Sequence, residues 1–366
     1  MRKGDKINFF DYWSSVVLDL LKKRFDKNNM FKSIKGFKQQ ITNSFEIESK
    51  WYKINQNIIN EQYNEIDSVL ICGMGGSAIG GELAKTMLSD HLNVPISINR
   101  SNSIPRWVND KTLIIISSYS GNTYETMESF HRSKRKTKKI IAISSKIDIL
   151  DKDSCPAINI PTGIQPRCAL GYIATIIMLV LIRLKLVYSP MNLKSKIKES
   201  TLELNHIDKM INNTNNRILS FSHKIKNSIP IIYGIENSTS IAALRFKNQL
   251  QENAKMISFS NNFPELNHNE IEGWNSKSNM FFVIWLKDPF LNEKDTKSIN
   301  ASIDLIESLN IKQEIIILNN KYTANSNKIA RLYKMIYFLD WVSYYLALLN
   351  NVNPTSIKNI EFIKKS

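Results

Sequence analysis

Short apolar runs alternate with helical patterns along this chain, and that alternation restricts its fold more than any other feature. In the first half the runs cover residues 69–72, 95–99, 113–117 and 140–144, with helical patterns at 77–90 and 122–136. The runs lack the period of two that marks a strand with one face in water, so they fit strands covered by helices on both sides. The pattern predicts a parallel sheet in a three-layer α/β/α arrangement.

A second series of the same kind begins near residue 229. Its apolar runs cover residues 229–233, 280–286 and 314–318, and a long helical pattern follows at 326–350. Residues 234–240 repeat the layout around Gly73 with fewer glycines. The sequence therefore predicts two similar α/β domains at 31–190 and 226–366, an N-terminal extension at 1–30 and a polar helical connection at 191–225.

Length and charge narrow the possible partners. With 366 residues, 43% of them hydrophobic, the chain can bury a large core. Its formal charge is +16, yet the lysines are scattered and form no basic arm, so we expect no nucleic acid as a partner. A positive field also attracts an anionic metabolite.

Neither a membrane nor a secretory route is expected. The most apolar stretch, residues 168–182, is short for a membrane span and reads as a buried core helix. The N-terminal apolar patch is interrupted by Asp11 and Asp19 and lacks a cleavage site. The three cysteines show no disulfide or metal-site spacing, which favours a reducing cytoplasm and predicts no metal.

Two loops rich in glycine and hydroxyl groups follow neighbouring apolar runs. They read Gly-Met-Gly-Gly-Ser at residues 73–77 and Ser-Tyr-Ser-Gly-Asn-Thr at 118–123. A strand that ends in such residues before a helix directs backbone N–H groups and hydroxyls to one point, where the helix N-terminus favours an anion. The predicted ligands of a phosphate monoester are Gly75, Gly76, Ser77, Ser118, Ser120 and Thr123.

Plainer interpretations fit each loop alone. The spacing of Gly73, Gly75 and Ala78 meets the minimal dinucleotide fingerprint, but the next strand ends at Asn99 and Arg100 instead of the ribose-binding acid. The glycines could serve only a tight turn, and the second loop could be a helix cap. Two such loops at neighbouring strand ends favour a sugar-phosphate pocket.

Five stretches together resemble the bifunctional phosphoglucose/phosphomannose isomerase family, whose domains are sugar-isomerase (SIS) domains. Besides the two loops, the first of which continues to Gly81, they are residues 166–172, 251–255 and 264–270, in the family's order. The likeness covers roughly residues 30–366. It implies two SIS domains and an intramolecular oxidoreductase that interconverts glucose 6-phosphate and fructose 6-phosphate, and also mannose 6-phosphate, without metal or organic cofactor.

Aldose–ketose isomerisation gives roles to residues in these stretches. A base must remove a proton beside a carbonyl and return it to the neighbouring carbon of the enediolate. The resemblance makes Glu252 this base, Arg167 the cation that stabilises the enediolate, and His268 the group that opens the sugar ring. Taken alone, they could equally be an exposed glutamate, a helix-start salt bridge and a satisfied polar contact. The family pattern brings His268 from a second subunit, which implies a homodimer.

The C-terminal residues 353–364 resemble the family's closing motif, with Asn353 where an aspartate is common. By that likeness Lys364 assists ring opening and Thr355 makes room for mannose stereochemistry. Lys358 and Lys365 compete for the role of Lys364, and a lysine near a chain end is usually solvated.

Two other functions stay open at the level of the sequence. The first is a non-catalytic SIS regulator that binds a sugar phosphate, which would need neither Glu252 nor His268 and would be expected to carry a helix-turn-helix segment. The second is an isomerase confined to the glucose and fructose esters.

Overall fold

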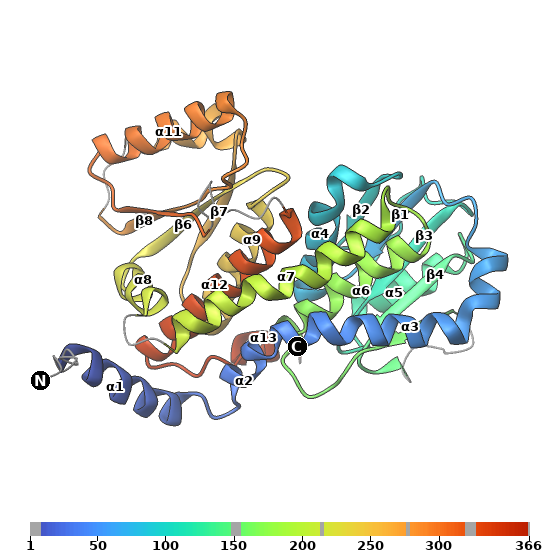
Figure 1. Ribbon diagram of the computed structural model, residues 1–366, viewed down its shortest axis with the longest axis horizontal. Coiled ribbons are helices and arrows are strands. Elements are labelled where there is room, and N and C mark those ends of the chain that lie inside the picture. The colour runs from blue at the N-terminus through green and yellow to red at the C-terminus, as the bar shows by residue number, and fades with distance from the viewer. Residues whose placement is uncertain (1–8, 148–154, 213–215, 276–278, 319–326, 365–366) are drawn as a thin grey trace, which may run out of the picture. The chain divides into compact units, whose positions relative to one another are not determined.

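The computed structural model describes residues 9–147, 155–212, 216–275, 279–318 and 327–364. The chain forms two compact units. The first-sheet unit is Lys35–Thr201, and the second-sheet unit combines Met1–Ile34 with Leu202–Ser366. Each unit is a parallel sheet flanked by helices, so the predicted α/β architecture is confirmed (Figure 1).

The first sheet has five strands in the order β2-β1-β3-β4-β5, and every neighbouring pair is parallel. Four of them lie where apolar runs predict them. The fifth, β5, is a three-residue strand that the sequence patterns do not reveal. The strands are β1 (Ser68–Cys72), β2 (Ile96–Asn99), β3 (Thr112–Ser117), β4 (Ile140–Ser144) and β5 (Ala157–Asn159).

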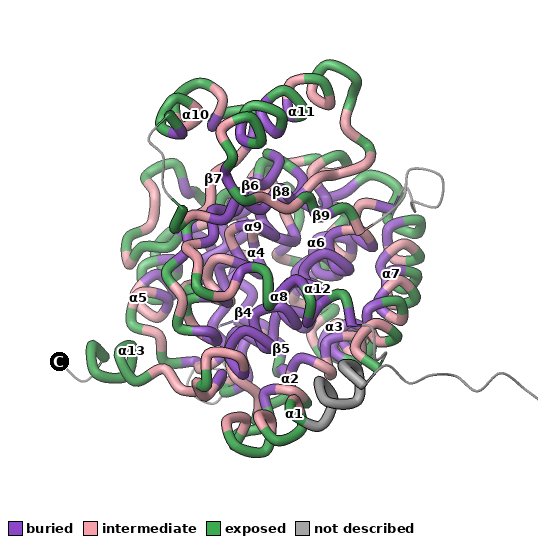
Figure 2. Tube along the Cα trace, turned by 90° about the vertical axis from the view of Figure 1, so that its left-hand side faces the viewer, coloured by how far each residue is buried: buried purple, intermediate pink, exposed green. Residues whose placement is uncertain are grey.

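The helices of the first-sheet unit bury their apolar residues against this sheet and against each other. One of them, α6, is buried at every residue from Leu170 to Ile182, as the apolar stretch predicts (Figure 2). Among the described residues, no helix combines the length and apolar character needed to cross a membrane. The main helices are α3 (Phe37–Gln62), α4 (Gly75–Leu88), α5 (Tyr124–Ser133) and α6 (Leu170–Arg183), and α7 (Pro190–Ile211) follows.

The second sheet repeats the strand order of the first. Its order is β7-β6-β8-β9, again all parallel, which matches β2-β1-β3-β4. The repeat predicted from the sequence is therefore present in the fold. The strands are β6 (Ile229–Ile235), β7 (Phe259–Phe263), β8 (Phe281–Leu286) and β9 (Gln313–Ile316).

Helices cover both faces of the second sheet. Figure 1 shows α11 on one side and α8, α9 and α12 on the other. The long helix α12 is buried from Ile329 to Leu348 except at Arg331. These helices are α8 (Arg217–Ile225), α9 (Ser240–Gln249), α11 (Glu293–Ser308) and α12 (Lys328–Leu349); the unit also has α1 (Phe9–Phe25), α2 (Met30–Lys35), α10 (Glu270–Gly273) and α13 (Lys358–Ile363).

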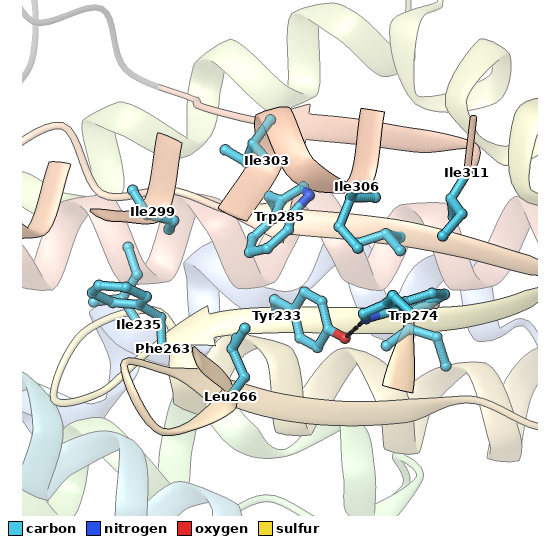
Figure 3. Packing of buried hydrophobic residues seen from close by; sticks show 12 residues of the cluster. Tyr233, Ile235, Phe263, Leu266, Trp274, Trp285, Ile299, Ile303, Ile306 and Ile311 are labelled. Carbon is cyan, nitrogen blue, oxygen red and sulfur yellow. Dashed lines mark hydrogen bonds between the residues drawn. The ribbon is translucent and has the colours of Figure 1, made fainter. Parts of the chain in front are cut away.

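Aromatic side chains fill the space between the second sheet and α11 (Figure 3). The rings of Tyr233 and Trp285 lie with centroids 4.8 Å apart, and the Trp274 indole donates to the Tyr233 hydroxyl at 2.8 Å. That hydroxyl donates to Glu270 at 2.6 Å. Burial and then Glu270 raise the pKa of Tyr233, so the hydroxyl stays protonated and the network holds.

A buried ion pair joins α9 to α12 on the opposite face of the sheet. Arg245 Nη2 lies 2.7 Å from Asp340 Oδ2, and the two side chains are only 4% and 6% exposed. Gln249 also donates to this carboxylate at 3.3 Å. Removing one member of such a pair leaves a buried charge and typically costs about 3–5 kcal/mol.

Candidate active site

The two serine-containing loops lie at adjacent strand ends. β1 pairs with β3 in register from Ser68 opposite Thr112 to Cys72 opposite Ile116. The strands are parallel, so the loops that begin at Gly73 and Ser118 leave the same edge of the sheet. This is the edge at which open α/β sheets bind ligands.

The first loop is shaped by a left-handed glycine. Gly75 has φ +49°, a conformation that residues with a side chain rarely adopt. It begins α4 directly, and the N-cap residue Met74 offers no side-chain acceptor. Ser77 lies in the first turn and is 7% exposed. The first turn of α4 therefore lacks a side-chain cap and can turn its backbone N–H groups to an anion.

The second loop gathers three hydroxyl groups. Ser118 donates to Thr123 Oγ1 at 3.4 Å, and the hydroxyls of Ser120 and Thr123 are 3.3 Å apart. Gly121 N–H donates to Ser118 Oγ at 3.2 Å. Thr123 precedes α5 but makes no side-chain cap to it. We call Ser77, Ser118, Ser120 and Thr123 the hydroxyl cluster.

Arg167 belongs beside the first loop. It lies in a short 3₁₀ helix, η3 (Pro166–Cys168), and is 5% exposed. A Cβ atom added at Gly76 would lie 3.2 Å from Arg167 Cα and would crowd the backbone of η3. Gln40 fixes the turn by donating to the Cys168 carbonyl at 2.7 Å. The first-sheet unit thus brings together Gly75, Gly76, Ser77 and Arg167.

Two titratable groups at these loops, Cys72 and Tyr119, stay neutral. Burial raises the pKa of the Cys72 thiol, at the end of β1, to about 11. Burial also raises the pKa of the Tyr119 hydroxyl. Neither group is a nucleophile at neutral pH. Because neither group carries a negative charge, neither opposes the binding of an anion at these loops.

Glu252 lies on a π-helical turn that follows α9. This π turn (Leu250–Ala254) ends at Lys255 in the left-handed conformation. Asn253 donates to Ser343 Oγ at 3.0 Å, and Asn350 donates to the Ala254 carbonyl at 3.1 Å. Both contacts hold the turn against α12 and its end. Single π-helical turns often mark functional positions, and this one holds the half-buried Glu252 on a fixed backbone.

Glu252 lines a pocket of about 670 Å³ in the second-sheet unit. Lys255 closes one wall, because its ammonium donates to the Glu252 carbonyl and, at 2.6 Å, to the Ser356 carbonyl. Thr355 precedes Ser356, is buried, and donates its backbone N–H to Asn353 at 2.8 Å. Asparagine therefore supplies the local cap that an aspartate would supply. The lining residues are Asn248, Gln251, Glu252, Lys255, Met256, Ile257, Ser356, Ile357, Lys358, Asn359 and Ile360.

Of the three C-terminal lysines, Lys358 lies in the lining of this pocket. Lys364 caps the end of α13, is exposed, and lies outside that lining. Lys365 falls outside the described residues. The structure thus places Glu252 and Lys358 at one pocket and gives no such place to Lys364.

His268 lies apart from Glu252 within one chain. It ends η5 (Glu265–His268) and is exposed, and its neighbour Asn267 accepts from Ser302 of α11 at 2.9 Å. The Glu252 turn, by contrast, is bonded to α12 and to Ser258, just before β7. His268 follows the far end of β7, whose five residues span about 13 Å. The segments that carry Glu252 and His268 are therefore bonded to helices on opposite faces of the second sheet.

Two parallel sheets with serine-lined strand ends define the class of protein: an α/β protein of SIS fold. Solved structures support that fold. The C-terminal domain of glucosamine-fructose-6-phosphate aminotransferase from Francisella tularensis aligns with a TM-score of 0.66 at 16% identity, covering 88% of this chain and 96% of that one. A glucose-6-phosphate isomerase from Chlamydia trachomatis aligns with a TM-score of 0.65 at 10% identity, covering 95% and 84%.

Sequence relatives define the family. The bifunctional phosphoglucose/phosphomannose isomerase of Caldicellulosiruptor bescii is 35% identical over 92% of this chain and 98% of its own length. That of Thermoplasma acidophilum is 33% identical over 81% of this chain and 89% of its own. Residues 214–366 match the model for the bacterial phospho-glucose isomerase C-terminal SIS domain. The chain belongs to the bifunctional phosphoglucose/phosphomannose isomerase family.

Replacing Lys255 with methionine tests how the pocket wall is held. The change removes both hydrogen bonds to the Glu252 and Ser356 carbonyls, so the backbone amides of residues 356–361 should exchange faster with solvent. The unfolding midpoint should change little, because Lys255 is exposed. Hydrogen–deuterium exchange read by mass spectrometry measures the effect. Lys364→Met is the matched control and should leave exchange unchanged; equal behaviour of the two variants would refute the role of Lys255.

Proposed function

We propose that this protein interconverts glucose 6-phosphate and fructose 6-phosphate, and also mannose 6-phosphate, by moving a proton through a cis-enediolate. The observation that carries the proposal is the anchored, half-buried Glu252 at a pocket, in a chain of this family. The transfer uses side chains alone, so the proposal includes no metal or organic cofactor.

The hydroxyl cluster would hold the phosphate. The Thr123 hydroxyl lies 3.4 Å from that of Ser118 and 3.3 Å from that of Ser120, and all three can turn their protons to an anion. The N-termini of α4 and α5 lack side-chain caps and add partial positive charge. Gly75 and Gly76 let the backbone approach the ester closely.

Glu252 would remove and return the proton, and Arg167 would stabilise the enediolate oxygen. Both steps need fixed groups, because a base or cation displaced by about 1 Å loses much of its effect. The π turn is tied to α12 through Asn253, and η3 is tied to α3 through Gln40. These contacts support the assignment of both residues.

Ring opening would use His268 and a C-terminal lysine. Lys358 is better supported than Lys364 for this role, since it lines the pocket that contains Glu252. Thr355 would shape the site for mannose stereochemistry; its burial and its place beside Ser356 support that role.

The protein would act as a cytoplasmic homodimer in which His268 serves the site of the partner. The reason is geometric: Asn253 and Asn267, the neighbours of Glu252 and His268, are bonded to helices on opposite faces of the second sheet. A second copy related by twofold symmetry can bring the two side chains together twice. The cytoplasm fits a chain of three buried cysteines and sugar-phosphate substrates.

Replacing Glu252 with glutamine removes the base and keeps the shape of the side chain. Turnover of fructose 6-phosphate should fall by about 10²–10⁴-fold, the usual contribution of a general base. Binding of the ester should persist, because the hydroxyl cluster is unchanged. A coupled assay that reports glucose and mannose 6-phosphate separately measures turnover, and calorimetry measures binding.

Glu272→Gln, an exposed carboxylate in the same unit, is the control and should keep full activity. Full activity of Glu252→Gln would contradict the proposed base. Loss of fructose 6-phosphate binding in that variant would show that Glu252 holds the substrate rather than transferring its proton.

Mixing two inactive variants tests the shared site. In a heterodimer of Glu252→Gln and His268→Ala chains, one of the two sites keeps both native side chains. Random exchange of subunits should therefore restore about a quarter of wild-type activity. Mass spectrometry of the intact dimers checks that exchange took place. Exchange without recovery would mean that Glu252 and His268 act within one chain.

A further inference from the structure

The second sheet repeats the strand-end geometry of the phosphate loops. β6 and β8 occupy the positions of β1 and β3 in the strand order. Asn237, after β6, has φ 55°, as Gly75 after β1 has φ 49°. The first residue after β8, Lys287, donates its N–H to β9 at 3.1 Å, as Ser118 donates to β4 at 3.0 Å. The loops after β6 and β8 therefore stand in the same relation to the second sheet as the loops after β1 and β3 do to the first.

Hydroxyl groups are present at this edge as well. Ser238 and Thr239 precede α9, whose N-terminus has no side-chain cap. Thr239 Oγ1 accepts from Ile235 N–H at 2.9 Å and donates to the Leu286 carbonyl at 2.5 Å, which ties the loop to β8. Ser238 Oγ donates to Asp288 Oδ2 at 2.5 Å.

Asp288 collects donors of the kinds that bind a phosphate. Arg331 of α12 reaches it with Nε 3.2 Å from Oδ1 and Nη2 3.2 Å from Oδ2. Phe290 N–H donates to Oδ1 at 3.0 Å. The side chains of Asp288 and Arg331 are only 10% and 11% exposed. A hydroxyl, a backbone N–H and a guanidinium thus converge on one buried carboxylate.

Among the residues that the structure describes, the space beside this carboxylate is too small for a further anion. The cavity lined by Thr239, Lys287, Asp288 and Arg331, among others, measures about 10 Å³. That is at most the space of one water molecule. An external phosphate can enter only if the carboxylate leaves.

We infer that Asp288 is a built-in anion that fills the second sheet's counterpart of the phosphate site, so that each chain binds one phosphate ester and not two. The groups around Asp288, a guanidinium, a hydroxyl and a backbone N–H, are of the kinds that bind a phosphate. The inference goes beyond the proposed reaction and does not depend on the role of Glu252. It predicts that removing the carboxylate uncovers a second phosphate site.

Asp288→Ala tests the inference with inorganic phosphate as the probe. In phosphate-free buffer the variant should unfold at a lower temperature than wild type, because Arg331 loses its carboxylate partner. Phosphate should restore most of that loss, whereas chloride at equal ionic strength should not. Calorimetry should give one phosphate per chain for wild type and two for the variant.

Asp340→Ala is the matched control. It removes the carboxylate partner of Arg245, another buried arginine of the same unit, but Asp340 lies in the middle of α12 and not at a strand end. Phosphate should therefore not recover its stability beyond the effect seen for wild type.

The outcomes separate this inference from the proposed function. Recovery by phosphate in Asp288→Ala but not in Asp340→Ala supports the built-in anion, even if wild type binds no phosphate and the hydroxyl cluster fails. Equal responses of the two variants overturn it. If Asp288→Ala does not fold, Asp288→Asn takes its place: one more phosphate per chain than wild type supports the inference, and the wild-type number overturns it.

Discussion

The parallel pairing of central strands is the constraint on which the rest of this structure depends. Because β1 and β3 run side by side in one direction, the two loops that follow them leave the sheet at one edge. The same pairing of β6 with β8 brings Ser238 to Asp288. One arrangement thus yields two strand-end sites, the first proposed to bind phosphate and the second filled by a carboxylate of the chain itself.

The central strands and the loops that follow them could be predicted from the sequence because their signals are local. Buried strands are continuous apolar runs, and the glycines and serines come directly after them. β7 escaped prediction because its residues Phe-Ser-Asn-Asn-Phe lie at the edge of the sheet and are mostly half-exposed. The grouping of residues 1–34 with the second sheet depends on distant contacts, such as Phe31 on Trp341 with ring centroids 4.9 Å apart and Asp26 with the Tyr344 hydroxyl.

The candidate site shows the same division between local and distant information. A motif could single out Glu252, but the π turn that carries it is held by Asn253 and Asn350 through contacts with residues about ninety positions away. The motif assigned ring opening to Lys364 rather than Lys358. Only the pocket could test that choice, because a lysine near a chain end leaves no pattern in the sequence. For Gly76 the sequence predicted only a contact with phosphate. The structure adds that this glycine makes space for the backbone of Arg167.

The most direct test of the account is a crystal structure of Glu252→Gln with fructose 6-phosphate. The account predicts phosphate oxygens hydrogen-bonded to Ser77, Ser118, Ser120 and Thr123, and the side chain at position 252 within about 3.5 Å of C1 or C2 of the sugar. A phosphate bound away from the hydroxyl cluster, or a sugar whose C1 and C2 lie beyond the reach of residue 252 in every copy, would contradict it.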